Sequence, residues 1–256
     1  MYKSFTAEEY KSHFNLPPDY KIEAFISYGS WNLEKEFNNT LEALKELSID
    51  CESKNLEGFL SNILEIKIDN KLYWFAVVYG GAILSEYLHL ACIFGSKQSI
   101  HIGSCGGLYP DMNSLDLLIP TWTYGLESSA SMYDKENTEH KYFADENLSK
   151  IIEVKLDKNY KIWKGPVVSC HAMLGETYDD VQNWSKQGYY GIEMETATVF
   201  AVSKHFNVPS VSLLYVGDNL IKGQTVQDES HNQEKDQREE LKKYVHRIAI
   251  EMVLNT

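Results

Sequence analysis

Short runs of apolar and β-branched residues alternate along this chain with longer segments of helical periodicity. Helical spacing covers residues 32–47 and 82–94, and a short helix capped by Thr6 ends near Pro17 and Pro18, which cannot continue it. The strand candidates are residues 24–28, 63–68, 72–79, 99–102, 115–120, 164–170, 191–193 and 210–215. Strands that alternate with helices form a mostly parallel sheet with helices on both faces, so the order of elements predicts an α/β fold.

The length and composition fit one globular domain that spans residues 1–256. Of the 256 residues, 43% are apolar and 24% are charged, which is enough for a complete core and a pocket. The sequence contains no repeat and no low-complexity tract. Two polar segments, residues 128–147 and 225–237, are predicted to be surface loops or helix starts at the rim of the pocket.

The charge and the cysteine content exclude several classes of protein. The net charge of −13 argues against a nucleic-acid partner, because such binding rests on clustered Lys and Arg. No segment approaches the ~20 consecutive apolar residues that cross a bilayer, and the first ten residues lack the apolar core of a signal peptide. Cys51, Cys92, Cys105 and Cys170 form no CxxC pair, which favours a reducing compartment and disfavours a zinc site. We therefore expect a cytoplasmic protein with no membrane partner and no bound metal.

Polar or glycine-rich motifs follow the apolar runs directly. In doubly wound α/β folds, the ligand site lies at the carboxyl ends of the strands. The motifs at these ends are residues 28–29, 79–81, 103–107, 171–174, 193–195 and 217–218. Their common position predicts that they converge on one ligand pocket.

Three acidic residues stand among these motifs. Glu193 and Glu195 flank Met194 at the start of an apolar helix, where glutamates are rarely buried without partners. This arrangement favours a hydroxyl-rich ligand over a structural ion pair. Asp218 has two readings that the sequence leaves open: it caps a helix, or it is an enclosed acid whose raised pKa lets it deliver a proton near neutral pH.

The glycine-rich segment 103–107 also has several interpretations. Its glycines and Ser104 form an anion cradle, or they form a turn that packs a strand against a helix. Its Gly-x-Cys-x-Gly spacing resembles a nucleophile elbow, which would make Cys105 an acyl-transfer nucleophile with His101 or His171 as base. The segment matches neither the dinucleotide fingerprint nor the Walker pattern, so we expect no cofactor.

Residues 100–107, 191–197 and 216–218 resemble, in order and spacing, the nucleoside phosphorylase and nucleosidase superfamily. This group includes hexameric purine nucleoside phosphorylases, uridine phosphorylases and methylthioadenosine nucleosidases. The likeness extends from about Glu23 to the last helix. It implies a single α/β domain with a central mixed sheet that closes into a distorted barrel flanked by helices. It also implies a small nucleoside as substrate and assembly into a homodimer or homohexamer.

The resemblance implies roles for particular residues. Met194 forms the apolar floor under the ribose, and Glu195 accepts hydrogen bonds from its 2′ and 3′ hydroxyls. Asp218 protonates or hydrogen-bonds N7 of a purine. This agrees with the chemistry, because breaking a ribosyl C–N bond develops oxocarbenium character and needs a protonated leaving group. The residues expected beside the base are Met173, Cys105, Gly106 and Asp218.

The acceptor site departs from the family pattern. The resemblance places Gly29, His101 and Ser104 around phosphate or water, where phosphorylases carry arginines, yet the chain's only arginines are Arg238 and Arg247. Each hydrogen bond to a charged group is worth about 1.5–3 kcal/mol, so their loss favours water over phosphate as acceptor.

The nucleosidase pattern is also incomplete. The glutamate expected to activate water aligns near Leu33, which leaves Glu34 or Glu193 as substitutes. The sequence thus predicts cleavage of the N-glycosidic bond of a nucleoside, purine preferred, with water as acceptor. Phosphorolysis to base and ribose 1-phosphate is the first alternative, and a catalytically inactive nucleoside-binding protein is the second.

Overall fold

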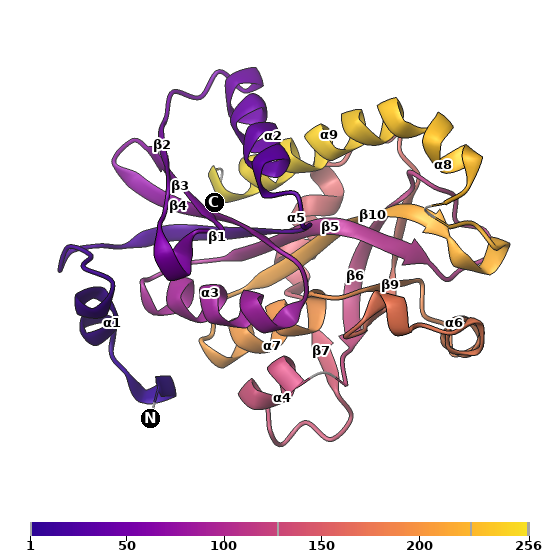
Figure 1. The fold of residues 1–256 in the computed structure, drawn as a ribbon, viewed down its shortest axis with the longest axis horizontal. Helices are drawn as coiled ribbons and strands as arrows, with labels where there is room; N and C mark the ends of the chain where they lie inside the picture. The colour runs from indigo at the N-terminus through magenta and orange to yellow at the C-terminus, as the bar shows by residue number, and fades with distance from the viewer. Residues whose placement is uncertain (1, 127, 226, 255–256) are drawn as a thin grey trace.

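The computed structural model describes residues 2–126, 128–225 and 227–254 (Figure 1). The strands are β1 (Ile22–Gly29), β2 (Glu52–Asn55), β3 (Ile63–Ile68), β4 (Lys71–Val78), β5 (Ser99–Gly107), β6 (Leu117–Tyr124), β7 (Lys141–Phe143), β8 (Ile162–Ser169), β9 (Gly191–Glu193) and β10 (Ser210–Asn219). The α-helices are α1 (Ala7–His13), α2 (Leu33–Glu46), α3 (Gly81–Ile93), α4 (Ser128–Tyr133), α5 (Glu146–Lys155), α6 (Tyr178–Lys186), α7 (Thr196–His205), α8 (Glu229–Gln233) and α9 (Lys235–Leu254). Short 3-10 helices are η1 (Tyr2–Ser4), η2 (Gly58–Leu60), η3 (Met173–Gly175) and η4 (Leu220–Lys222).

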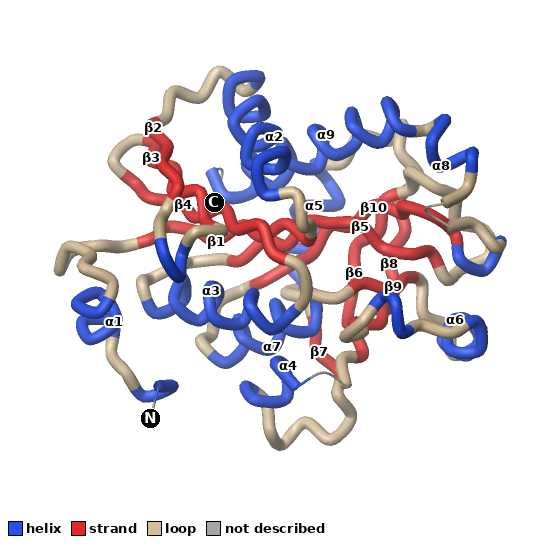
Figure 2. Tube along the Cα trace, viewed as in Figure 1, coloured by secondary structure: helices blue, strands red, loops and turns tan. Residues whose placement is uncertain are grey.

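The strands form one mixed sheet that is partly closed on itself (Figure 2). Strands β10, β6, β8, β9 and β5 make a ring, which closes because β5 also pairs with β10, and β1, β4, β3 and β2 extend outward from β5. The distorted barrel implied by the family resemblance is therefore confirmed. The mostly parallel sheet predicted from the alternation of elements is wrong: β10 pairs antiparallel with β6, and β5 antiparallel with β9. No helix lies between β5 and β6 to carry a parallel crossover, so the chain turns back.

Helices cover both faces of the sheet (Figure 1). Helices α2 and α9 lie on one face, over an apolar core that includes Phe37, Ile102 and Val245. Helices α3 and α7 pack together on the other face, over a second core that includes Trp74 and Phe200. The site is therefore positioned by strands that are held rigidly from both sides.

Local capping follows the sequence prediction. The Thr6 side chain accepts a hydrogen bond from the Glu9 amide at 3.2 Å, and Glu9 accepts from the Thr6 amide at 2.7 Å, which forms a capping box at the start of α1. Asn32 caps α2 by accepting a hydrogen bond from the Lys35 amide, without a reciprocal bond. Within residues 2–126, 128–225 and 227–254, every helix is too short or too polar to cross a bilayer.

Candidate active site

The carboxyl ends of β4, β1, β5 and β10 lie in a row. These strands are parallel neighbours, with Gly29 opposite Val78 of β4 and Tyr28 opposite Ile102 of β5. On the other side of β5, Asp218 of β10 pairs with Gly106. Segments that are far apart in the sequence thus meet at one edge, as the strand-end motifs predicted.

Glu195 lies buried between the ends of β1 and β4. Its Oε1 accepts a hydrogen bond from the Gly80 amide at 2.5 Å, and only 5% of the residue is exposed. A Cβ atom at Gly29 would come within 2.9 Å of Glu195 Oε2, so position 29 has to be glycine for the carboxylate to sit there. A Cβ at Gly80 would lie 3.9 Å from Met194 Cε, which places the Met194 thioether beside the same carboxylate. The apolar floor and the hydroxyl-binding group expected for a ribose are therefore adjacent.

His101 completes this cluster. It is fully buried, its Nδ1 lies 3.0 Å from Ser27 Oγ, and its Nε2 lies 3.9 Å from Glu195 Oε2. No hydrogen-bond partner for Nε2 is found among the described residues. Burial lowers the pKa of His101 to about 3, so the imidazole is neutral at physiological pH. It is a polar but uncharged group at the place where the family resemblance implies an arginine in phosphorylases.

Glu193 has a structural role that the sequence did not distinguish from that of Glu195. Its Oε2 accepts hydrogen bonds from the amides of Glu195 and Thr196, both at 2.7 Å, and Ser169 donates to its Oε1. Burial raises its pKa, and these hydrogen bonds partly offset the shift. The carboxylate thus fastens the start of α7 to β8.

This placement corrects the expected water-activating glutamates. Glu193 is already held by three donors, and Glu34 is exposed on α2. The ligand atoms of His101, Glu193 and Glu195 lie within 4.8 Å of one another, a spacing that metal sites also show. Because the Glu193 oxygens are engaged in fastening α7, we assign no metal to this group.

Asp218 is not a helix cap. It belongs to β10, and the cap of the following turn is Asn219, whose side chain accepts hydrogen bonds from the amides of Ile221 and Lys222. Burial raises the pKa of Asp218 to about 6, and the nearby Glu176 charge adds to the shift, whereas Arg238 lowers it. The second sequence reading, an enclosed acid that holds its proton near neutral pH, therefore agrees with this environment.

Glu176 is a site residue that the sequence analysis missed. Its Oε1 accepts a hydrogen bond from Cys170 Sγ at 3.2 Å, and burial raises its pKa. Burial also raises the pKa of Tyr79, and the charges of Glu195 and Glu176 raise it further. The charges of Glu195, on the ribose side, and of Glu176 thus both act on Tyr79. The available sequence signal was the position of Glu176 just after the end of β8.

The residues expected beside the base are only partly brought together. Met173 lies on η3 and is 41% exposed, and a Cβ at Gly106 would come within 2.7 Å of the Leu220 side chain. Cys105 is different: its side chain is buried in an apolar cluster with Leu118 and Val216, so its thiol does not line the base pocket. Burial raises the pKa of this thiol well above its usual range, which also rules it out as an acyl-transfer nucleophile.

The glycine-rich segment is strand rather than a turn or an anion cradle. Gly106 and Gly107 pair with β9 on one side and β10 on the other, so their backbone belongs to the sheet. Side chains alternate between the two faces of a strand, so the Ser104 side chain lies on the face of β5 opposite to that of His101. Burial raises the pKa of Tyr215 to about 12, and hydrogen bonds with Tyr28 and Ser104 and the Arg238 charge counteract this shift. Ser104 thus belongs to a group with Tyr215 and Arg238, separate from Gly29 and His101.

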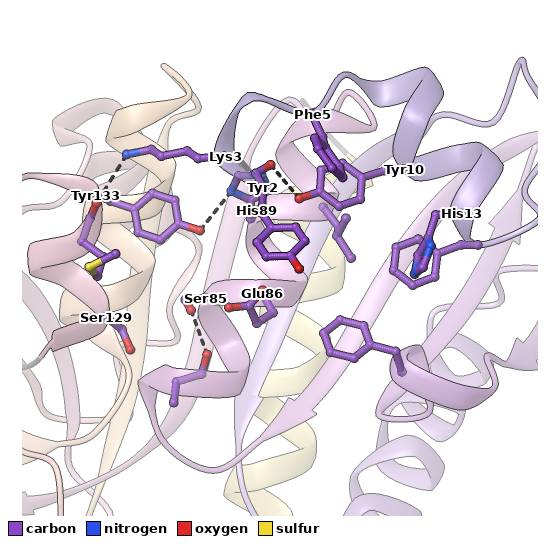
Figure 3. Close-up of a pocket in the computed structure, with 15 residues that line it drawn as sticks. Tyr2, Lys3, Phe5, Tyr10, His13, Ser85, Glu86, His89, Ser129 and Tyr133 are labelled. Carbon is purple, nitrogen blue, oxygen red and sulfur yellow. Dashed lines mark hydrogen bonds between the residues drawn. The ribbon is translucent and has the colours of Figure 1, made fainter.

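A cavity is lined by residues other than these carboxylates. It has a volume of about 850 Å³ and lies between the N-terminal segment and α3 (Figure 3). Aromatic rings dominate its lining, and His89 Nδ1 lies 2.9 Å from the Tyr133 hydroxyl within it. It contains none of the residues that the family resemblance singled out.

Comparison with known proteins places the chain in a family. Residues 82–253 match the sequence model of the phosphorylase superfamily. The chain belongs to this superfamily. The family resemblance of the motifs is therefore confirmed.

Relatives within the superfamily are distant in sequence. A guanosine phosphorylase from Halorubrum lacusprofundi is 29% identical over 130 residues, a match that covers 50% of this chain and 53% of the relative. A DeoD-type purine nucleoside phosphorylase from Vibrio vulnificus is 24% identical over 224 residues, which cover 85% of this chain and 90% of the relative. The first match thus spans about half of its relative, and the second spans most of it.

Two solved structures show the same fold. Uridine phosphorylase from Vibrio fischeri has a TM-score of 0.74 at 17% identity, covering 93% of this chain and 95% of that one. The 5′-methylthioadenosine/S-adenosylhomocysteine nucleosidase from Campylobacter jejuni has a TM-score of 0.71 at 17% identity, covering 92% and 100%. As a member of the superfamily, the protein is an enzyme, and cleavage of nucleoside N-glycosidic bonds is the class of reaction that membership supports.

Proposed function

We propose that this enzyme cleaves the N-glycosidic bond of a purine nucleoside and uses water as the acceptor. The observation that carries the proposal is the pairing of two different carboxyl groups at one row of strand ends. Glu195 is buried beside Met194 and Gly80, and Asp218 has a pKa raised to about 6. The Glu195 carboxylate is suited to bind the hydroxyls of a sugar, and the Asp218 carboxyl is suited to protonate a leaving base.

The chemistry follows from these two environments. Protonated Asp218 donates a proton to N7 as the bond between C1′ and the base breaks, so the base leaves as a neutral molecule. The ribose develops oxocarbenium character, and Glu195 holds its 2′ and 3′ hydroxyls in place. Met194 offers a soft apolar surface beneath the ring and does not react with it.

The neutral His101 supports water as the acceptor. Phosphate binding needs charge-assisted donors, and the buried imidazole beside Gly29 and Glu195 carries no charge. The Glu195 carboxylate in the same cluster would repel a phosphate dianion. A neutral water molecule needs no charged donor and is not repelled by the Glu195 carboxylate.

Phosphorolysis is the second candidate, and one observation favours it. Arg238 is buried and close enough to Tyr215 and Asp218 to lower the pKa of both groups, and Tyr215 also contacts Ser104. The Arg238 guanidinium near Ser104, a residue that the family resemblance assigns to the phosphate site, is a group that binds anions. Arg238 also pairs with Glu234 at 3.7 Å, which reduces the charge it presents.

The acceptor can be decided by product analysis. Adenosine, inosine, methylthioadenosine and uridine are incubated with the protein, with and without phosphate, and free base is measured together with ribose and ribose 1-phosphate. We expect the purine nucleosides to give base and free ribose at rates independent of phosphate. Ribose 1-phosphate formed only when phosphate is present would establish phosphorolysis. If none of the four nucleosides releases a free base, the remaining candidate is a protein that binds nucleosides without cleaving them.

The pH dependence of kcat/KM is expected to report Asp218. Its pKa is raised to about 6, and the protonated form is the active one. The rate is therefore constant below pH 6 and falls about tenfold per pH unit above it, provided that chemistry limits turnover. Stopped assays across pH 4.5–8.5 measure this. A rate that rises through the same interval would mean that the ionised carboxylate is the active form.

Two further expectations remain predictions for this protein. The assembly into a homodimer or homohexamer can be measured by sedimentation. The cytoplasmic location can be measured by cell fractionation. The proposed chemistry does not depend on either.

A further inference from the structure

Two glycines and Glu195 surround the buried Nε2 atom of His101. A Cβ at Gly103 would lie 3.5 Å from Nε2 and 3.6 Å from the Gly29 amide nitrogen. Because both positions are glycine, neither contributes a side chain beside Nε2. Glu195 Oε2 lies 3.9 Å from Nε2.

We propose that His101 Nε2 and Glu195 Oε2 together hold the acceptor water, and that His101 takes the proton from it. The proposal rests on the proposed use of water as acceptor. Two atoms 3.9 Å apart can both lie about 2.8 Å from one water oxygen, which is a normal hydrogen-bond length. A carboxylate has several acceptor positions, so Glu195 can bind this water as well as the ribose.

Ser27 is placed to accept the Nδ1 hydrogen of the tautomer that this role requires. Its hydroxyl lies 3.0 Å from His101 Nδ1, and both residues are buried. When Nδ1 carries the hydrogen and donates it to Ser27 Oγ, Nε2 is left as an acceptor facing Glu195. A buried polar atom without a partner is costly, so a bound water at Nε2 would also remove a desolvation penalty.

A weakly basic imidazole is sufficient for this step. The water oxygen becomes strongly acidic as it bonds to the cationic C1′, so its proton leaves readily. The water oxygen forms a bond to C1′, the C1′–N bond breaks with its electron pair going to the base, and Asp218 protonates N7. The water proton passes to Nε2, where the imidazolium faces the Glu195 carboxylate. After product release this proton returns through solvent to Asp218, and the net reaction is nucleoside plus water to base plus ribose.

The test uses His101→Gln, which keeps a polar side chain but cannot accept a proton. The matched control is His89→Gln, since His89 is also buried and has its Nδ1 bonded to a hydroxyl, that of Tyr133. We expect kcat for inosine to fall about 10²–10³-fold in His101→Gln, with inosine affinity by calorimetry changed less than threefold. His89→Gln is expected to keep the wild-type kcat.

A second variant keeps the proposal testable if His101→Gln does not fold. Ser27→Ala frees the tautomer and is expected to lower kcat about 5–10-fold while KM stays constant, since only part of the imidazole population then accepts at Nε2. Wild-type kcat in either folded variant would overturn the role of His101, while ribose release by the wild-type enzyme would still support hydrolysis. Ribose 1-phosphate as the wild-type product would instead overturn the proposed acceptor and this inference with it.

Discussion

Replacing Asp218 by asparagine is expected to lower kcat for purine nucleosides about 10²–10⁴-fold, the usual contribution of a general acid. Asparagine preserves the size of the side chain and can still donate a hydrogen bond to N7, so nucleoside binding should remain measurable. What it cannot do is transfer a proton, and the base would have to leave as an anion. Steady-state assays with inosine, together with calorimetric titration of the variant, separate the loss of chemistry from the loss of binding.

The matched control is Asp116→Asn. Asp116 is buried just before β6, and its backbone carbonyl accepts a hydrogen bond from the Val216 amide at 2.8 Å. Its carboxylate accepts hydrogen bonds from the Asn113 amide at 2.9 Å and the Trp163 indole at 2.8 Å, so the side chain has a structural role near the end of β10 and none assigned toward the nucleoside. We expect this change to lower the melting temperature while kcat stays near the wild-type value. Unchanged turnover in Asp218→Asn would remove Asp218 from the mechanism.

Replacing Glu195 by alanine is expected to weaken kcat/KM for ribonucleosides far more than for 2′,3′-dideoxynucleosides. Each hydrogen bond from a hydroxyl to the carboxylate is worth about 1.5–3 kcal/mol, so the loss of two corresponds to about 10²–10⁴-fold. The dideoxy analogues cannot make these bonds. Their kcat/KM therefore falls only by the amount that the carboxylate contributes through its other contacts. The measurement is the ratio of kcat/KM for inosine and dideoxyinosine in the wild type and in the variant.

Glu193→Gln is the control for this prediction. The glutamine keeps the shape of the side chain but weakens the hydrogen bonds that fasten α7, so both analogues should be affected by the same factor. The melting temperature should also fall, because a charged partner of buried amides is lost. If Glu195→Ala reduced both analogues equally as well, the hydroxyl contact assigned to Glu195 would be wrong.

Much of the fold followed from local patterns in the chain. The predicted strand 63–68 coincides with β3, and the predicted 191–193 coincides with β9. The short strands β2 and β7 were missed, because four and three residues carry little periodicity and exist through pairing with β3 and β6. The glycines of residues 103–107 suggested a turn, but pairing on both sides keeps them in β5.

The site was foreseen in outline and not in detail. The convergence of strand ends followed from the order of elements, and Glu195, Met194 and Gly29 do lie together. The sequence treated Glu193 and Glu195 alike, although one binds the start of its own helix and the other reaches the Gly80 amide. Two neighbouring acids of the same type thus have different partners, which no local pattern specifies.

The amino-acid sequence by itself determined the α/β class, most of the elements and the motifs that identify the superfamily, because periodicity, capping and spacing are properties of neighbouring residues. Only the tertiary structure decided which groups are buried and what they face. His101 is neutral because residues from other strands exclude water around it, and its open nitrogen faces Glu195 across 94 positions of the chain. Asp218 keeps its proton up to about pH 6 because burial and the Glu176 charge raise its pKa. These properties arise from long-range packing, which sets solvent exposure and charge environment.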